Sequence, residues 1–427
     1  MKYNQNEKIL QINDETLIIG VDVASETHYA RAFNYRGIEL GKVIRFDNNA
    51  VGFATLGIWI RELRVKHQKQ HVMVGMEPTG HYWFNLAQYL KDHDLQGVLV
   101  NPYHVNRSKE LDDNNPTKND RKDPKTIAML VKDGRYMTAY IPEGIFSDLR
   151  TTMDTRWIIV KQLNAIRNRM KRWISIYFPE FNTVFADWEG KAALAALKKF
   201  PLPAQVLEKG VDNIVACWKE DKIRTVGMKR AIKLTEAART SVGVRSGVLA
   251  AENNLLTLIE DYEMRMLQYE RTMAIVDKIV FQIPGVSEML KIKGVGLVGI
   301  AGFIAEVGDI RRFEHPKQIQ KLAGLNLIEN SSGKHKGMTT ISKRGRSRLR
   351  AILYQSIMPL VSKNPEFIEL HKHYTTRLQN PLKKKQSLIL LCCKLIRVFY
   401  AILTKGIKYD PQKMMNDIRR PSMQPAA

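Results

Sequence analysis

The chain has 427 residues, and its 67 lysines and arginines against 43 aspartates and glutamates give a formal net charge of +24 at pH 7. An isoelectric point near 9.8 is typical of nucleic-acid-binding proteins, although membrane-surface and ribosome-like structural proteins share such a composition. The sequence indicates no membrane span and no signal-peptide core, and its three cysteines fit neither a disulfide framework nor a zinc site. We therefore expect a cytoplasmic protein of two or three domains without a membrane partner.

The first ~140 residues alternate strand and helix patterns, which indicates an α/β domain with a central sheet. Three strand-like segments come first, followed by a helix and then a strand–helix–strand unit, at residues 17–23, 28–33, 40–46, 52–67, 71–76, 83–90 and 98–100. This is the order of elements in ribonuclease-H-like folds, and we expect the domain to span residues 1–140.

Four carboxylates stand at the ends of these predicted elements. Asp22 interrupts one apolar strand-like run, and Glu77 ends another. Asp120 and Asp123 lie three residues apart at the start of a predicted helix, on one helical face. A charge inside a sheet costs free energy unless it is paired or binds a metal. The four acids together therefore predict a site for Mg²⁺ or Mn²⁺, with a phosphodiester as the substrate in so basic a protein.

Each acid also has a purely structural interpretation. Asp22 alone fits a turn or a helix cap, Glu77 alone a surface acid, and Asp120 or Asp123 alone a helix start with Pro124 in the first turn. The combination favours a metal site, because Mg²⁺ accepts a few carboxylates and keeps positions for water and phosphate. Two such ions can stabilise the attacking and the leaving oxygens of an in-line displacement.

Residues 141–282 read as a helical linker followed by a coiled coil. Arginines and lysines interleave with apolar residues between Met153 and Tyr177, and no chemistry can be assigned to residues 181–245. A stripe with strict 4-3 spacing follows, formed by Leu255, Ile259, Tyr262, Met266, Tyr269, Met273, Val276 and Val280. The spacing predicts a coiled-coil seam between two subunits, and a helix packed on its own domain is the alternative.

Two motifs mark residues 283–375, and residues 376–427 read as a basic tail. Gly294 and Gly296 lie between two helix-like stretches, in a helix-hairpin-helix-like pattern that can present backbone N–H groups to a phosphate. A tight helix–helix turn is the plainer interpretation. Seven lysines and arginines and no acid lie from Lys334 to Arg350. A solvated charge run is the usual meaning, but we predict phosphate contacts from Lys334, Lys336, Lys343, Arg344, Arg346 and Arg348.

Short motifs at both ends of the chain occur in a recognisable order. They are Gly20-Val-Asp-Val-Ala24, Met76-Glu-Pro-Thr-Gly80, Lys118-Asn-Asp-Arg-Lys-Asp123, Lys293-Gly-Val-Gly296, Gly308-Asp-Ile-Arg-Arg-Phe313, Ala323-Gly-Leu325, Ser332-Gly333 and Ser342-Lys-Arg-Gly345. With these motifs the chain resembles the DEDD transposases of bacterial insertion sequences, which are bridge-RNA-guided serine recombinases. The resemblance covers about residues 16–135 and 282–360; residues 181–250 and the tail after 375 depart from it.

The resemblance implies a RuvC-like domain whose acids are Asp22, Glu77, Asp120 and Asp123, and a helical transposase domain whose serine falls on Ser332, with Ser331 adjacent. It implies that Ser332 Oγ attacks a DNA phosphodiester and forms a covalent phosphoserine, aided by Mg²⁺ at the acids. It further implies a bridge RNA that selects the element ends and the target by base pairing, a homodimer or tetramer, and association with the bacterial nucleoid.

Two other functions remain open from the sequence. A metal-dependent junction-resolving endonuclease would use the same acids with water as the nucleophile. A non-catalytic protein that packages nucleic acid would need only the charge of +24. Covalent attachment of DNA to the protein under denaturing conditions distinguishes the three.

Overall fold

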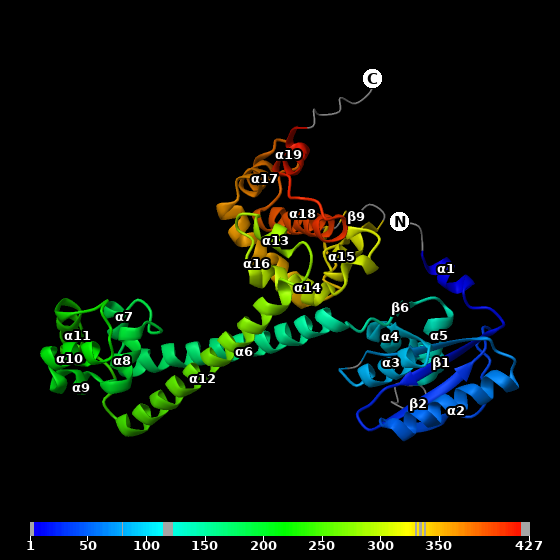
Figure 1. Ribbon diagram of the computed structural model, residues 1–427, viewed down its shortest axis with the longest axis horizontal. Coiled ribbons are helices and arrows are strands. Elements are labelled where there is room, and N and C mark those ends of the chain that lie inside the picture. Colours follow the sequence, from blue (N-terminus) through cyan, green and yellow to red (C-terminus); the bar gives the residue numbers. More distant parts are fainter. Residues whose placement is uncertain are drawn as a thin grey trace. The chain divides into compact units, whose positions relative to one another are not determined.

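The computed structural model describes residues 4–78, 80–113, 123–328, 331–332, 335–336 and 339–419. The chain folds as two compact units, Met1–Ile141 and Pro142–Ala427. The first is a mixed α/β unit, and the second is helical apart from short two-stranded ribbons (Figure 1).

A six-stranded sheet forms the centre of the first unit, in the order β3-β2-β1-β4-β5-β6. Strands β1, β4 and β5 are parallel, whereas β2, β3 and β6 each run antiparallel to their inner neighbour. The bounds are β1 (Thr16–Asp22), β2 (Thr27–Phe33), β3 (Ile44–Asp47), β4 (His71–Met76), β5 (Gln96–Val100) and β6 (Tyr136–Thr138). The third strand is shorter than predicted, because Gly41 takes a φ of +93° ahead of it. The three-residue β6 was not predicted.

Helices cover both faces of this sheet. On one face, α2 (Ala50–Lys66) and α3 (Trp83–Asp92) share a core with Leu17, Ile19 and Val21 of β1. On the other face, α4 (Pro102–Asp113) and α5 (Asp123–Lys132) share a core with Ile18. The alternation of β1 between the two cores follows from the two-residue period of a strand. A short helix, α1 (Asn4–Leu10), precedes the sheet, and its Gln5 side chain donates to the backbone of Asp133.

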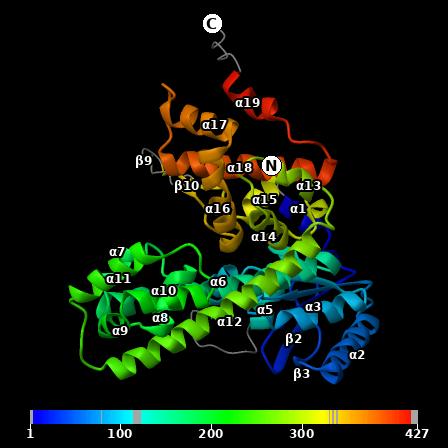
Figure 2. The same cartoon turned by 60° about the vertical axis from the view of Figure 1, so that its left-hand side comes forward.

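Two long antiparallel helices begin the second unit, α6 (Gly144–Tyr177) and α12 (Val248–Val280), and they lie side by side in both views (Figures 1 and 2). Trp173 Nε1 near the end of α6 donates a hydrogen bond of 2.8 Å to the Ala251 carbonyl near the start of α12. The stripe predicted as a seam between subunits packs within the chain, since Leu255, Ile259 and Tyr262 share one core with α6. The predicted packing of this stripe against a second subunit is therefore corrected: in the structure the stripe packs against α6 of the same chain.

The segment without assignable chemistry forms a small helical lobe. Its apolar residues, including Trp218, Leu234 and Phe200, join the end of α6 and the start of α12 in one core. The helices are α7 (Phe181–Val184), α8 (Lys191–Lys199), α9 (Pro203–Lys209), α10 (Val211–Glu220) and α11 (Met228–Arg239).

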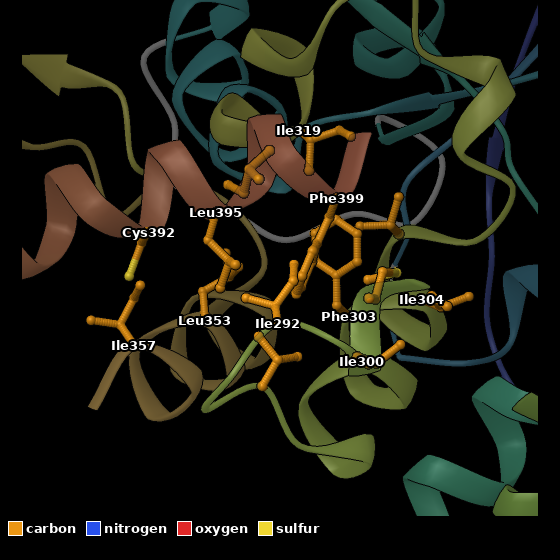
Figure 3. Packing of buried hydrophobic residues seen from close by; sticks show 14 of the residues in the cluster. Ile292, Ile300, Phe303, Ile304, Ile319, Leu353, Ile357, Cys392, Leu395 and Phe399 are labelled. Carbon is orange, nitrogen blue, oxygen red and sulfur yellow. The ribbon is translucent and has the colours of Figure 1, made fainter. Parts of the chain in front are cut away.

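A second helical core occupies the C-terminal part. It contains α13 (Val286–Leu290), α14 (Leu297–Val307), the 3-10 helix η1 (Ile310–Arg312), α15 (Pro316–Leu322), α16 (Ser347–Lys363), α17 (Pro365–Thr376), α18 (Lys384–Lys405) and α19 (Pro411–Arg419). Helix α18 lies inside the segment predicted as a basic tail, yet Leu395 and Phe399 pack against α14 and α16 in the middle of this core (Figure 3). The prediction of a separate tail was wrong for α18, because its apolar side is buried.

Helix α18 also corrects the expectation that no segment resembles a membrane span. Within the described part of the chain it alone is long and apolar enough to cross a bilayer, judged by length and composition. One side of it lies in the helical core, with buried Leu388, Leu391, Cys392, Leu395, Ile396, Phe399 and Ile402.

We expect Phe399→Ala to destabilise the second unit by about 3–5 kcal/mol, since the ring is buried and its removal leaves a cavity. Phe399 also packs edge-on against Phe303, with ring centroids 5.1 Å apart. Leu378→Ala is the matched control, because that side chain is fully exposed and its loss costs less than about 0.5 kcal/mol. Urea unfolding followed by circular dichroism measures both. Equal midpoints for the two variants would contradict a structural role for α18.

Candidate active site and nucleic-acid interface

Asp22 and Glu77 lie at neighbouring positions on one face of the sheet. Strands β1 and β4 are parallel and in register, with Val21 paired to Met76, so the two acids follow adjacent strands at the same edge. Val21 and Met76 point into the core under α2 and α3. Because side chains alternate along a strand, Asp22 belongs to the opposite face of the sheet, which α5 covers. Glu77 directly follows Met76, so by the same alternation it belongs to that face as well. Both side chains are partly buried.

Two glycines allow α5 to lie close to the sheet beside these acids. Gly20 and Gly75 are direct partners across β1 and β4. A Cβ atom on Gly20 would lie 1.8 Å from the Pro124 carbonyl oxygen, and one on Gly75 would lie 2.5 Å from a methyl group of Val131. The Gly20 clash is with the backbone of α5 and cannot be relieved without moving that helix, whereas the Gly75 clash is with side chains of α5. The glycine pair therefore determines where α5 begins relative to the strand ends.

Asp123 is the first residue of α5, directly before Pro124. It lies one helical turn before Ile127, whose side chain borders Gly75, so Asp123 begins the helix edge that faces β4. Asp123 is partly buried, whereas Asp120 lies outside the described residues. Among the described side chains, no three histidines, cysteines or acids are grouped closely enough to hold a metal ion. The structure thus places Asp22 and Glu77 at adjacent strand ends and Asp123 at the start of the helix that covers the same sheet face, and Asp120 is not described.

A buried histidine that the sequence analysis did not single out anchors the loop after Asp22. His28 on β2 is fully buried, and its Nδ1 accepts a hydrogen bond of 3.1 Å from the Ala24 backbone N–H. Burial lowers the pKa of His28, against smaller opposing effects of Asn48 and Asp47. The ring is therefore neutral at pH 7, and Nδ1 keeps the lone pair that orders the turn. The available signal was the position of His28, which shares the inward face of β2 with the apolar Ala30 and Ala32.

The predicted nucleophile lies in a pair of short β ribbons in the second unit. Strand β7 (Leu327–Ile328) pairs with β10 (Thr340–Ile341), and β8 (Ser331–Ser332) pairs with β9 (His335–Lys336). Ser332 is opposite His335 in the backbone pairing. The structure describes only the backbone of Ser331, Ser332 and Lys336, and Lys334 lies outside the described residues.

The two motifs that flank these ribbons contact each other through glycines. The Gly345 Cα has no room for a Cβ, which would lie 2.4 Å from the Leu322 carbonyl oxygen. Gly324 takes a φ of +68°, and its carbonyl accepts a hydrogen bond from the Lys343 N–H at 3.0 Å. This contact presents Lys343 and Arg344 at the surface, where both are exposed.

Arg346 and Arg348, predicted to contact phosphate, are engaged in an internal ion-pair cluster. Glu306 on α14 is buried, and its carboxylate lies 3.4 Å from Arg346, 3.5 Å from Arg348 and 3.8 Å from Arg150. Arg348 also pairs with Asp154 of α6. The phosphate contacts of Arg346 and Arg348 stay a prediction, and within the chain these two guanidinium groups are partners that a buried carboxylate requires. The sequence analysis did not identify Glu306, because a single acid near the end of an apolar helix gives no signal of an ion pair.

Gly294 and Gly296 have different roles in the turn before α14. Gly294 has a φ of +98°, and a Cβ there would lie 3.1 Å from the Pro359 carbonyl oxygen, so this glycine permits close packing on α16. Gly296 is the N-cap of α14, and a Cβ there would meet open space. Gly294 thus has the conformation and packing of a tight helix–helix turn. The space beside Gly296, at the N-terminus of α14, is open.

Comparison with known proteins finds transposase families that match parts of both units. A DEDD transposase model of the IS110 type matches residues 19–179, and the model described as "Transposase IS116/IS110/IS902 family" matches residues 283–372. The chain is 23% identical to an uncharacterised 44.8 kDa protein of insertion element IS116 from Streptomyces clavuligerus, over 92% of this chain and 96% of that protein.

Two further relatives share parts of the chain. A probable family 20 transposase of Pseudomonas aeruginosa is 22% identical over 45% of this chain and 55% of its own length. A pilin gene-inverting protein of Moraxella lacunata is 30% identical over 20% of this chain and 26% of its own length. Residues 19–179 and 283–372 thus match transposase families, and together these matches cover more than half of the chain. The protein belongs to the IS110/IS116 family of insertion-sequence transposases.

Proposed function

We propose that this protein cuts and rejoins DNA through a covalent phosphoserine on Ser332, with the acids Asp22, Glu77, Asp120 and Asp123 as the metal-binding part of the machinery. The observation that carries the proposal is that Asp22 and Glu77 follow adjacent parallel strands, on the sheet face covered by α5, the helix that Asp123 begins. The strand order β3-β2-β1-β4-β5 supports a ribonuclease-H-like, RuvC-like assignment for the first unit.

The donor set of the proposed metal site fits Mg²⁺ or Mn²⁺. All four candidate ligands are carboxylates, and hard oxygen ligands with no cysteine or histidine suit these ions. Such an ion, when bound, supplies charge stabilisation for a phosphoryl group under attack. Asp22 and Glu77 would hold it from the strand ends, and Asp123 from the first turn of α5.

The proposed step exchanges one phosphoester bond for another. The Ser332 Oγ–P bond forms as the P–O bond to one deoxyribose oxygen breaks; the serine proton leaves to solvent or a carboxylate, and the released oxygen becomes a hydroxyl. Rejoining reverses the exchange, with the hydroxyl of another strand attacking phosphorus. The ester bond is conserved, so no other energy source is required.

The net charge of +24 supports nucleic acid as the partner of this chain. Lys343 and Arg344 are exposed next to the serine ribbons and can contact a DNA or RNA backbone. We propose a bridge RNA as the element that reads DNA sequence, since this leaves the protein with backbone contacts. A homodimer or tetramer is proposed as well, and with α6 covering the α12 stripe its contacts must lie elsewhere.

A denaturing gel tests the proposal. We expect the wild-type protein, incubated with Mg²⁺, the element's RNA and labelled DNA carrying the element's end, to give a labelled band that survives boiling in detergent and disappears on protease digestion. The covalent bond predicts this result. Cleaved DNA without such a band would favour the junction-resolving endonuclease with water as nucleophile, and tight binding without cleavage would favour a packaging protein.

A further inference from the structure

A cavity of about 220 Å³ lies between α6, α14 and α16 of the second unit. It is smaller than the roughly 300–1,000 Å³ of pockets for drug-sized ligands. Gly299 and Gly302 form one wall, and a Cβ on Gly299 would lie 2.5 Å from Ser356 Oγ. The helix backbones therefore approach closely and leave a narrow slot with apolar sides such as Ile352.

Positive charge exceeds negative charge around this slot. Arg156 and Arg348 line it, together with the buried carboxylate of Glu306. Counting the direct partners of Glu306 and Arg348, four guanidinium groups (Arg150, Arg156, Arg346 and Arg348) face two carboxylates (Asp154 and Glu306). Burial, and then the nearby Arg346, lower the pKa of Arg150. An anionic group at the slot would relieve this excess.

The slot also carries groups suited to a planar base. Trp157 lines it, with the Arg348 guanidinium 5.1 Å from its ring centroid. Gln355 adds an amide that can donate and accept. The Nε atom of Arg156 is buried and has no hydrogen-bond partner among the described residues. Aromatic rings and guanidinium planes are the groups on which unstacked bases rest, and guanidinium groups bind phosphate.

We propose that this cavity holds one unpaired nucleotide, with its base in the slot beside Trp157 and Gln355 and its phosphate at Arg156. The inference rests on the proposed action on nucleic acid, and it adds a binding site separate from the acids and from Ser332. An unpaired nucleotide fits because a slot of about 220 Å³ lined by three helices has no room for a base that remains stacked in a duplex. The RNA and the DNA both provide such nucleotides.

Binding of the full-length protein to oligonucleotides tests this site. Duplexes with one unpaired 2-aminopurine are compared with fully paired duplexes, as RNA and as DNA, by fluorescence titration at fixed salt. We expect the unpaired nucleotide to tighten wild-type binding about tenfold, in keeping with the stacking of one base. The strand type that shows the preference identifies the source of the nucleotide.

Three variants make the test specific. Arg156→Met removes the proposed phosphate contact, and Gly296→Leu adds a side chain at a cavity-lining position where a Cβ meets open space. Both should lose the preference. Arg169→Met removes the same charge from the exposed side of α6, away from the cavity lining, and should keep it. A wild type without the preference, or cavity variants that retain it, would overturn the inference. The detergent-stable DNA adduct is assayed on the same preparations, so a failed pocket with an intact adduct leaves the proposed function standing.

Discussion

Asp22→Asn is expected to slow DNA strand cleavage by about 100-fold or more, while DNA and RNA binding stay at least as tight as in the wild type. The variant keeps the shape of the side chain but removes a charge that a bound cation would require. An activation free energy raised by about 3 kcal/mol or more corresponds to a 100-fold slower reaction. Removal of a negative charge also reduces repulsion of phosphate. Cleavage of labelled DNA in Mg²⁺ and filter binding at fixed salt measure the two effects.

Asp92→Asn is the matched control for this experiment. Asp92 ends α3, on the sheet face opposite to α5, and it is exposed. The same loss of charge in the same unit should therefore leave cleavage unchanged. Wild-type cleavage by Asp22→Asn would refute the assignment of Asp22, whereas equal losses in both variants would indicate a general effect of charge. Thermal unfolding of each variant separates a folding defect from a catalytic one.

Ser332→Ala is expected to abolish the covalent protein–DNA adduct while RNA and DNA binding persist. Alanine removes the attacking oxygen and little else, and no other group supplies the bond to phosphorus if serine is the nucleophile. The adduct band on a denaturing gel is the measurement, with binding recorded by gel shift. Because the loss concerns bond formation itself, we expect no residual adduct above background.

Ser331→Ala provides the internal control, since both serines belong to β8 and differ by one position. It should retain the adduct. The reverse outcome, an essential Ser331 and a dispensable Ser332, would show that the nucleophile lies one residue earlier than the motif indicates. Cleavage by both variants together with a wild type that forms no adduct would favour water as the nucleophile.

Much of the first unit was predictable because its information is local. A two-residue period identifies a strand and its inward face, and the order of the segments gave the meander and the crossovers. The sequence predicted β4 at residues 71–76, as found, and placed Asp22 and Glu77 at strand ends. It missed β6, since three residues contain too little pattern. It also extended β3 across Gly41, whose conformation ends the regular pattern.

Only the tertiary structure decided which surfaces meet. An apolar stripe such as that of α12 requires burial but does not name its partner, and here the partner is α6 of the same chain. The basic composition after residue 375 concealed α18, because charge averaged over a segment does not reveal that one helical side is apolar. Arg346 and Arg348 lie in a basic run, yet Glu306, some forty residues earlier, pairs with both.

The sequence by itself determined which functional groups the protein has: acids at strand ends, a serine–glycine motif and a large positive charge. It also determined the strand order, which brings Asp22 beside Glu77. The tertiary structure decided how these groups are positioned. Gly20 and Gly75 meet across two strands and admit α5, so that Asp123 begins at the same edge. Neither glycine alone predicts where α5 lies. The close approach joins segments far apart in the sequence, and it is therefore determined by packing and not by a local sequence pattern.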